Sequence, residues 1–315
     1  MKKQKNWIGI LIGLVLLLVI VNPYFVNAQY PGVGFGALNE KFKDEKGQIE
    51  DLSKEEKKAA KQALKEEKNA IKQKAKQEKE EIKAKEKEGW ELTFLDNFDG
   101  DALDPTKWKH APEWPRQGGA GQWSNDEAFL NGEGQLIIQV SEIDGKYYSG
   151  AVRTRDLFEQ TYGYFEINAK IPKTEGYWNA FWLMTDGVHT VGNDGRDGTE
   201  IDIFESPFAK DGDYIQHAIH WDGYEEYHRS AGQVAHVPGI YEGFHTFALE
   251  WDPDEYIFYI DGQETWRTNA GGVSQVPAYM KITAEVGGWA GNISNASLPS
   301  QMEVEYVRAY KKKDK

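Results

Sequence analysis

The sequence predicts an all-β fold, a sandwich of two sheets, for residues 89–312 of this 315-residue chain. From Trp90 onward, short alternating or aromatic-rich runs recur between turns of Gly, Asp and Pro, and no long helical pattern separates them. Asp261-Gly262 stands between two such runs and is a strong signal for a hairpin turn. Many short strands without helices between them pack best as two facing sheets. The expected strands are 92–98, 136–140, 147–155, 162–171, 177–184, 200–205, 214–221, 245–251, 256–260, 281–286 and 302–310.

Residues 1–28 have the pattern of an export signal. Three lysines precede a 15-residue apolar run from Trp7 to Val21, and Val26-Asn27-Ala28 offers a small-residue cleavage site. A membrane-spanning helix needs about 20 apolar residues, so we expect cleavage, and a retained membrane anchor is the alternative. In both cases we expect an exported protein that is secreted, periplasmic or anchored at the outer side of a membrane.

Residues 29–88 form a spacer in which a Gly-rich stretch is followed by a charged helix. Residues 40–88 contain 16 Lys and 14 acidic residues, and Ser53-Lys54-Glu55-Glu56 matches a capping box that would begin the helix. Gly89 stands where such a helix would end. The apolar residues of the helix are too sparse for a coiled-coil seam. We therefore predict a solvated spacer helix, with a weak oligomerisation helix as the alternative.

The charge of the β-rich part excludes some partners. Residues 89–310 contain 36 acidic and 14 basic residues, a net charge of about −22, which argues against binding to nucleic acid or to anionic membranes. The same charge disfavours a heavily sulfated or carboxylated polysaccharide, unless a local basic patch overrides it. The chain has no Cys, so no disulfide contributes to its stability.

The segment Glu200-Ile201-Asp202-Ile203-Phe204-Glu205 carries the chemistry. In a regular strand Glu200 and Asp202 share one face, but strict alternation would put Phe204 beside them in place of Glu205. A one-residue bulge after Ile203 restores the phase, so that all three acids face one cleft.

Three carboxyl groups on one face cannot all ionise freely, so one of them should hold a proton near neutral pH. A carboxylate nucleophile opposite a protonated carboxylic acid, about 5 Å away, is what retaining glycoside hydrolysis requires. A solvated acidic face and a calcium site are the alternative explanations. Thirteen per cent aromatic residues, including 11 Trp, fit a β-rich core or a cleft in which sugars stack.

The segment Tyr177-Trp178-Asn179-Ala180-Phe181-Trp182, followed by the acidic motif, resembles glycoside hydrolase family 16, most closely its bulged, laminarinase-like members. The likeness continues in residues 94–99, 162–166, 256–262 and 304–310. It implies a β-jelly-roll with an open cleft and retaining endo-hydrolysis, in which Glu200 is the nucleophile and Glu205 the general acid/base. Asp202 lies between them and tunes the pair.

The resemblance implies a polysaccharide substrate, and we expect an endo-β-1,3(4)-glucanase. A galactanase of the same fold, of the agarase or carrageenase type, and a transglycosylase are the nearer alternatives. A non-catalytic glycan-binding protein is a more distant one, because a pure binder has no need of the acid cluster.

Further residues are assigned to substrate binding. Trp178 and Trp182 lie four residues apart on one strand and so share a face, where an indole can stack on a sugar ring. The resemblance places Trp182 at a sugar-binding position, turns His220 toward the cleft, and gives Asn125 and Arg153 hydrogen bonds to substrate hydroxyls.

The resemblance also implies a structural calcium ion. The family often has Asp in the final strand as a ligand, and Glu305 stands there in this chain. We expect the ion to be held by Glu305 and the backbone carbonyl of Gly134, without a part in the chemistry. No cofactor is expected for catalysis.

Overall fold

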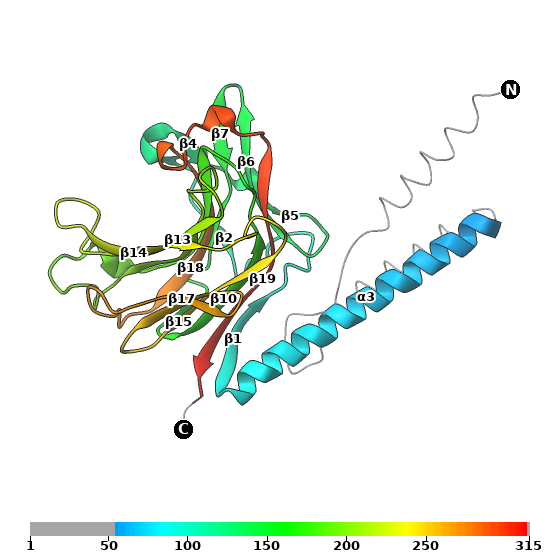
Figure 1. The fold of residues 1–315 in the computed structure, drawn as a ribbon, viewed down its shortest axis with the longest axis horizontal. Helices are drawn as coiled ribbons and strands as arrows, with labels where there is room; N and C mark the ends of the chain where they lie inside the picture. Colours follow the sequence, from blue (N-terminus) through cyan, green and yellow to red (C-terminus); the bar gives the residue numbers. More distant parts are fainter. Residues whose placement is uncertain (1–53, 314–315) are drawn as a thin grey trace. The chain divides into compact units, whose positions relative to one another are not determined.

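A computed structural model describes residues 54–313, which divide into two compact units (Figure 1). One unit holds the helix α3 (Lys54–Lys87) and the other holds all the strands. The predicted spacer helix is therefore present and ends just before Gly89. The predicted signal segment and Gly-rich stretch lie outside the described residues. Within residues 54–313 no helix is both long enough and apolar enough to cross a membrane.

The helix α3 gains support from its own polar side chains. Gln62 and Gln77 donate hydrogen bonds to the carboxylates of Glu66 and Glu81, each one turn further along. Such pairs four residues apart stabilise a helix by about 0.2–0.5 kcal/mol each. Ala60, Leu64 and Ile71 form a small apolar cluster along it.

The strands form two sheets, as predicted, and their pairs are mostly antiparallel (Figure 1). The larger sheet has 11 strands in the order β17 (Gln263–Thr268), β16 (Tyr256–Ile260), β15 (His245–Trp251), β10 (Gly163–Lys170), β19 (Ser300–Lys312), β6 (Leu136–Ile143), β7 (Lys146–Ser149), β4 (Gly121–Trp123) and β3 (Pro115–Arg116), with β1 (Trp90–Asp96) on β19 and β5 (Ala128–Leu130) on β6. The smaller sheet has eight strands in the order β14 (Arg229–His236), β13 (Tyr214–Trp221), β12 (Glu200–Glu205), β11 (Tyr177–Met184), β18 (Ala278–Val286), β8 (Ala151–Arg153) and β2 (Lys109–His110), with β9 (Glu159–Gln160) on β18. Within the larger sheet the short pair β4–β7 is parallel.

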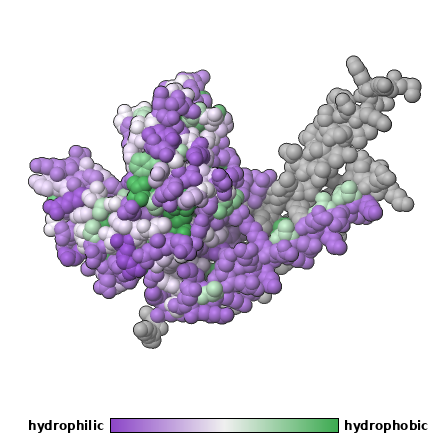
Figure 2. Space-filling model, viewed as in Figure 1, coloured by the Kyte–Doolittle hydropathy of each residue, from purple (hydrophilic) through white to green (hydrophobic). Residues whose placement is uncertain are grey.

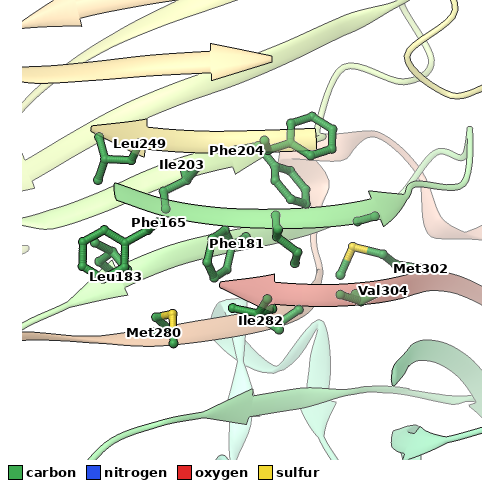
Figure 3. Packing of buried hydrophobic residues seen from close by; sticks show 14 of the residues in the cluster. Phe165, Phe181, Leu183, Ile203, Phe204, Leu249, Met280, Ile282, Met302 and Val304 are labelled. Carbon is green, nitrogen blue, oxygen red and sulfur yellow. The ribbon is translucent and has the colours of Figure 1, made fainter. Parts of the chain in front are cut away.

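The core lies between the two sheets (Figure 3). Phe165 and Leu249 enter it from the larger sheet, and Phe181, Ile203 and Ile282 enter it from the smaller one. These side chains are fully buried, and burying one such side chain contributes about 1.5–3 kcal/mol to folding. On the face shown in Figure 2 the coloured surface is mostly hydrophilic, and hydrophobic residues gather in one area of the sandwich.

Strand β18 shows how the smaller sheet separates its two faces. Its even-numbered residues from Met280 to Val286 belong to the core. Its odd-numbered residues from Tyr279 to Glu285 line a cleft on the opposite face. The cleft therefore lies on the face of the smaller sheet that is turned away from the core.

The predicted hairpin joins β16 to β17 through Asp261 and Gly262. Both turn residues have positive φ angles, 48° and 72°, which is the backbone of a type I′ turn. The sequence did not predict β14. Most of its residues are exposed, because it is the edge strand of the smaller sheet and lacks the hydrophobic alternation of a half-buried strand.

Candidate active site

The acidic motif forms strand β12, and a bulge at Ile203 sets its geometry. Against β11, Asp202 pairs with Trp182 and Phe204 pairs with Phe181, which leaves Ile203 without a partner in that ladder. Ile203 and Phe204 therefore both enter the core. The predicted bulge is present, and it turns the three acids of the motif into one cleft.

A buried histidine supports the bulge from the neighbouring strand β13. His217 donates a hydrogen bond from Nδ1 to the carbonyl oxygen of Ile203, at 2.7 Å. Burial lowers the pKa of His217 to about 4, so the ring is neutral at physiological pH. The bond satisfies a backbone carbonyl that would otherwise lie unpaired beside the core, which would cost about 1–3 kcal/mol.

The cleft has a volume of about 490 Å³ and is lined by three kinds of side chain. Aromatic residues make up much of the lining, the acids of β12 belong to it, and basic side chains come from β3, β8, β18 and the segment after β8. The lining residues are Trp114, Arg116, Gln117, Trp123, Arg153, Arg155, Trp178, Ala180, Trp182, Met184, Asp186, His189, Glu200, Asp202, Glu205, Tyr224, Tyr279, Lys281, Thr283 and Glu285.

Glu200 and Glu205 have different surroundings. The hydroxyl of Tyr224 donates a hydrogen bond to Oε2 of Glu200. Burial and the charge of Asp202 raise the pKa of Glu200 to about 7, against the opposing effects of His220, Tyr224 and Lys281.

Glu205 accepts a hydrogen bond from Nε1 of Trp178, at 3.1 Å. Burial and the charges of Asp202 and Glu200 hold the pKa of Glu205 well above its usual range. The pKa of Glu205 is therefore raised, as the proton-donating member of a nucleophile–acid pair requires.

Asp202 is buried, and a chain of imidazoles lies behind it. Nε2 of His220 is 3.3 Å from Oδ2 of Asp202, and Nδ1 of His220 is 2.9 Å from Nε2 of His228. Burial lowers the pKa of His220, but the hydrogen bond and charge of Asp202, together with the charge of Glu200, outweigh burial and raise it. His220 thus contacts Asp202 and is not among the lining residues of the cleft.

The other predicted substrate-binding residues fall into two groups. Arg153, Trp178 and Trp182 line the cleft. One face of Trp182 is covered by the ammonium group of Lys281, which lies 3.6 Å from the ring centre. Asn125 lies outside the cleft, in the short helix η2 (Asn125–Glu127), where its side chain is exposed and its backbone N–H bonds to Glu113.

Several cleft residues were not predicted. Tyr224 follows β13 in a loop, and no local pattern marks it. Lys281 and Glu285 stand on β18, where a parity argument like that used for Glu200 and Asp202 would have found them, because polar residues alternate there with apolar ones. Glu285 forms a salt bridge with Arg116 at 2.9 Å, in a part of the cleft assembled from β3 and β18.

Metal binding was predicted at Gly134 and Glu305. Gly134 has a positive φ of 76°, and Glu305 is a half-buried residue of β19. Calcium takes six to eight oxygen ligands. Among the described residues, the group of three carboxylate or imidazole side chains that could hold a metal is Glu200, Asp202 and His220, with ligand atoms within 4.8 Å of one another. Calcium at Gly134 and Glu305 stays a prediction.

Comparisons with known proteins agree with this geometry. The family model "Glycosyl hydrolases family 16" matches residues 118–308. A beta-glucanase of Rhodothermus marinus is 30% identical over 251 residues, which cover 70% of this chain and 85% of the relative. An endo-1,3-1,4-beta-glycanase of Rhizobium meliloti is 31% identical over 172 residues, which cover 54% of this chain and 35% of that longer relative.

The fold also matches a solved structure. The catalytic domain of an endo-1,3-beta-glucanase (laminarinase) of Thermotoga petrophila superimposes with a TM-score of 0.61 and 27% sequence identity. The match covers 71% of this chain and 99% of that domain.

Proposed function

Because this chain belongs to glycosyl hydrolase family 16, we propose that it is an endo-β-glucanase that cleaves β-1,3 or mixed β-1,3-1,4 linkages. It is a glycoside hydrolase, and enzymes of this family retain the configuration of the anomeric carbon. The observation that carries the proposal is the bulge at Ile203, which gathers three acids in one cleft and leaves two of them, Glu200 and Glu205, with raised pKa values. The relatives named as β-glucanases support the choice of substrate.

In the first step Glu200 acts as the nucleophile. Its ionised carboxylate adds to the anomeric carbon, while Glu205 donates its proton to the glycosidic oxygen and the leaving sugar departs. The product is a glycosyl ester on Glu200. The hydrogen bond from Tyr224 favours the ionised form of Glu200, and the high pKa of Glu205 keeps the proton available.

In the second step the same carboxyl groups exchange roles. The ester removes the negative charge of Glu200, so one of the charges that raised the pKa of Glu205 is gone and Glu205 becomes a base. Glu205 then takes a proton from a water molecule that attacks the anomeric carbon, and Glu200 leaves as a carboxylate.

Asp202, His220 and Trp178 act as positioning residues. Asp202 raises the pKa values of both carboxyl groups, and His220 contacts Asp202 from the neighbouring strand β13. Trp178 donates to Glu205 and fixes the direction of its carboxyl group.

We also propose that the protein is exported. The lysines and the apolar run of residues 1–28 support this, and a polymeric substrate is met outside the cytoplasm. A cleavage assay on the protein made by its own host would test it: the purified mature chain should begin after Ala28, whereas retention of Met1 in a cytoplasmic fraction would contradict it.

The substrate is tested by release of reducing sugar from laminarin, lichenan, agarose, carrageenan and xyloglucan, with Glu200→Gln as the inactive control. We expect products from laminarin or lichenan. Release from agarose or carrageenan alone would replace the glucanase with a galactanase of the same fold. Transfer to added xyloglucan oligosaccharides in preference to water would identify a transglycosylase.

A further inference from the structure

The cleft contains cations that the proposed hydrolysis of a neutral glucan does not use. Four basic side chains line it, although the surrounding domain is strongly acidic. Arg116 is paired with Glu285 at 2.9 Å, and Arg155 is paired with Asp186 at 2.5 Å. For Arg153 and Lys281, no carboxylate among the described residues lies within ion-pair distance.

Lys281 is almost completely buried, with 7% of its surface exposed. Its ammonium group lies between two indole rings, 3.6 Å from the ring centre of Trp182 and 4.8 Å from that of Trp123. Contacts with ring faces contribute about 0.5–2 kcal/mol, whereas withdrawing an unpaired ammonium group from water costs several kcal/mol. Burial lowers the pKa of Lys281 to about 7, and the charge of Glu200, which acts from beyond ion-pair distance, opposes this effect. An anion beside the amine would oppose it further and keep Lys281 protonated.

Arg153 is directly opposite Lys281 in the antiparallel ladder between β8 and β18. Like charges that face each other across strands destabilise a sheet. In addition, Nε of Arg153 is buried and donates no hydrogen bond within the described chain. Two neighbouring cations with unused donors therefore face the cleft, and an anion between them would satisfy both.

The sheet register fixes where such an anion would lie. Asp202 pairs with Trp182, Trp182 pairs with Lys281, and Lys281 pairs with Arg153, so the four residues form one row across the smaller sheet. Neighbouring strands are about 4.8 Å apart, which puts Lys281 and Arg153 about 10 Å and 14 Å from the catalytic strand. The cation pair thus lies in the same row as Asp202, two and three strands away from it.

We propose that Arg153 and Lys281 form an anion-binding subsite, which accepts a sulfate or carboxylate substituent carried by the sugar chain next to the cleavage point. Arg offers a planar fork of donors and Lys a compact charge, and both groups recognise these oxyanions. The inference rests on the proposed function for the direction of the sugar chain, but its test does not require turnover. Because Arg153 and Lys281 lie inside the cleft, the net negative charge of the domain does not exclude an anionic substrate there.

Binding is measured with the full chain carrying Glu200→Gln, so that no substrate is consumed. Two matched pairs of carbohydrates serve as probes: laminarin and laminarin sulfate, and carrageenan oligosaccharides before and after chemical desulfation. Carboxymethylated β-1,3-glucan is included to distinguish a carboxylate from a sulfate. We expect the anionic member of at least one pair to bind about 10-fold more tightly, since a hydrogen bond to a charged group is worth that factor or more.

Variants then assign the effect to the two cations. Adding Lys281→Met, which keeps an apolar chain between the indoles, or Arg153→Gln should abolish the preference, and Lys281→Arg should retain it. Lys109→Gln is the matched control, because Lys109 is the next residue of the same row but is paired with Asp156 at 3.2 Å and lies outside the cleft lining. Lys109→Gln should leave the preference unchanged.

The subsite is refuted if the anionic probes bind no more tightly than the neutral ones in every pair. It is also refuted if their preference survives both Lys281→Met and Arg153→Gln. Should Lys281→Met fail to fold, Arg153→Gln decides the assignment. Failure of the wild-type enzyme to cleave any β-glucan would overturn the proposed function alone, because the binding comparison is made on an inactive chain and includes galactans.

Discussion

The hydrogen bond from Tyr224 to Glu200 should set the pH at which the enzyme begins to work. Tyr224→Phe removes the hydroxyl and leaves the ring. A hydrogen bond to a charged group is worth about 1.5–3 kcal/mol, and the lower end applies because 41% of the Tyr224 surface is exposed. One pKa unit corresponds to about 1.4 kcal/mol, so the pKa of Glu200 should rise from about 7 by about one unit.

The direction of the pH effect follows from the role of Glu200. The nucleophile must be ionised, so activity is present above the pKa of Glu200 and is lost as the pH falls through it. At pH 7 the ionised fraction should drop about fivefold in Tyr224→Phe, and the loss should vanish about two units higher.

The assay is kcat/KM for the preferred glucan between pH 4 and 10, which reports the groups of the free enzyme. Tyr227→Phe is the matched control, since Tyr227 is an exposed residue of the same loop and is not part of the cleft lining. An acid limb that stays in place in Tyr224→Phe, or moves to lower pH, would refute the reasoning. An equal shift in Tyr227→Phe would show that the loop as a whole, and not the hydroxyl, is responsible.

Three further predictions concern stability. Glu205 has a raised pKa in the folded state, so its ionisation costs stability as the pH rises above its ordinary value of 4.5; the melting temperature of Glu205→Gln should therefore exceed that of the wild type at pH 8 and approach it below pH 4.5, and the reverse order would contradict the raised pKa. Arg116→Gln leaves the buried carboxylate of Glu285 without its partner and should lower the free energy of unfolding by about 3 kcal/mol in urea titrations, whereas a change below about 0.5 kcal/mol would mean that the pair is solvated. A chelator should lower the melting temperature but not the activity of the folded protein at low temperature, if calcium binds at Glu305 and Gly134; an unchanged melting temperature would remove calcium from the account.

The three acids of the cleft could be located from sequence because strand parity is a strict geometric rule. Glu200 and Asp202 share a face by alternation, and the position of Glu205 in the same motif required one bulge, which the structure has at Ile203. The hairpin at Asp261-Gly262 was predictable for a similar reason, because few residue pairs accept two positive φ angles. In these cases a local backbone rule determines the outcome.

Contacts between distant segments could not be predicted in this way. Tyr224 reaches Glu200 from a loop, and Arg116 meets Glu285 across 169 residues of chain. Lys281 likewise lies over Trp182 only because β11 pairs with β18, and no local sequence pattern predicts that pairing. The exposed edge strand β14 was missed because its polar residues carry no burial pattern.

The stereochemistry of cleavage tests the central claim, that the bulge at Ile203 makes Glu200 and Glu205 a retaining pair. If Glu205 is on the face of Glu200, the carboxyl groups are about 5–5.5 Å apart and leave no room for a water molecule between nucleophile and sugar. Proton NMR of the first products, recorded before mutarotation, should show the β-anomer, and an added acceptor sugar should be glycosylated in competition with water. Initial release of the α-anomer would contradict the account, because it requires carboxyl groups farther apart than the bulged strand allows.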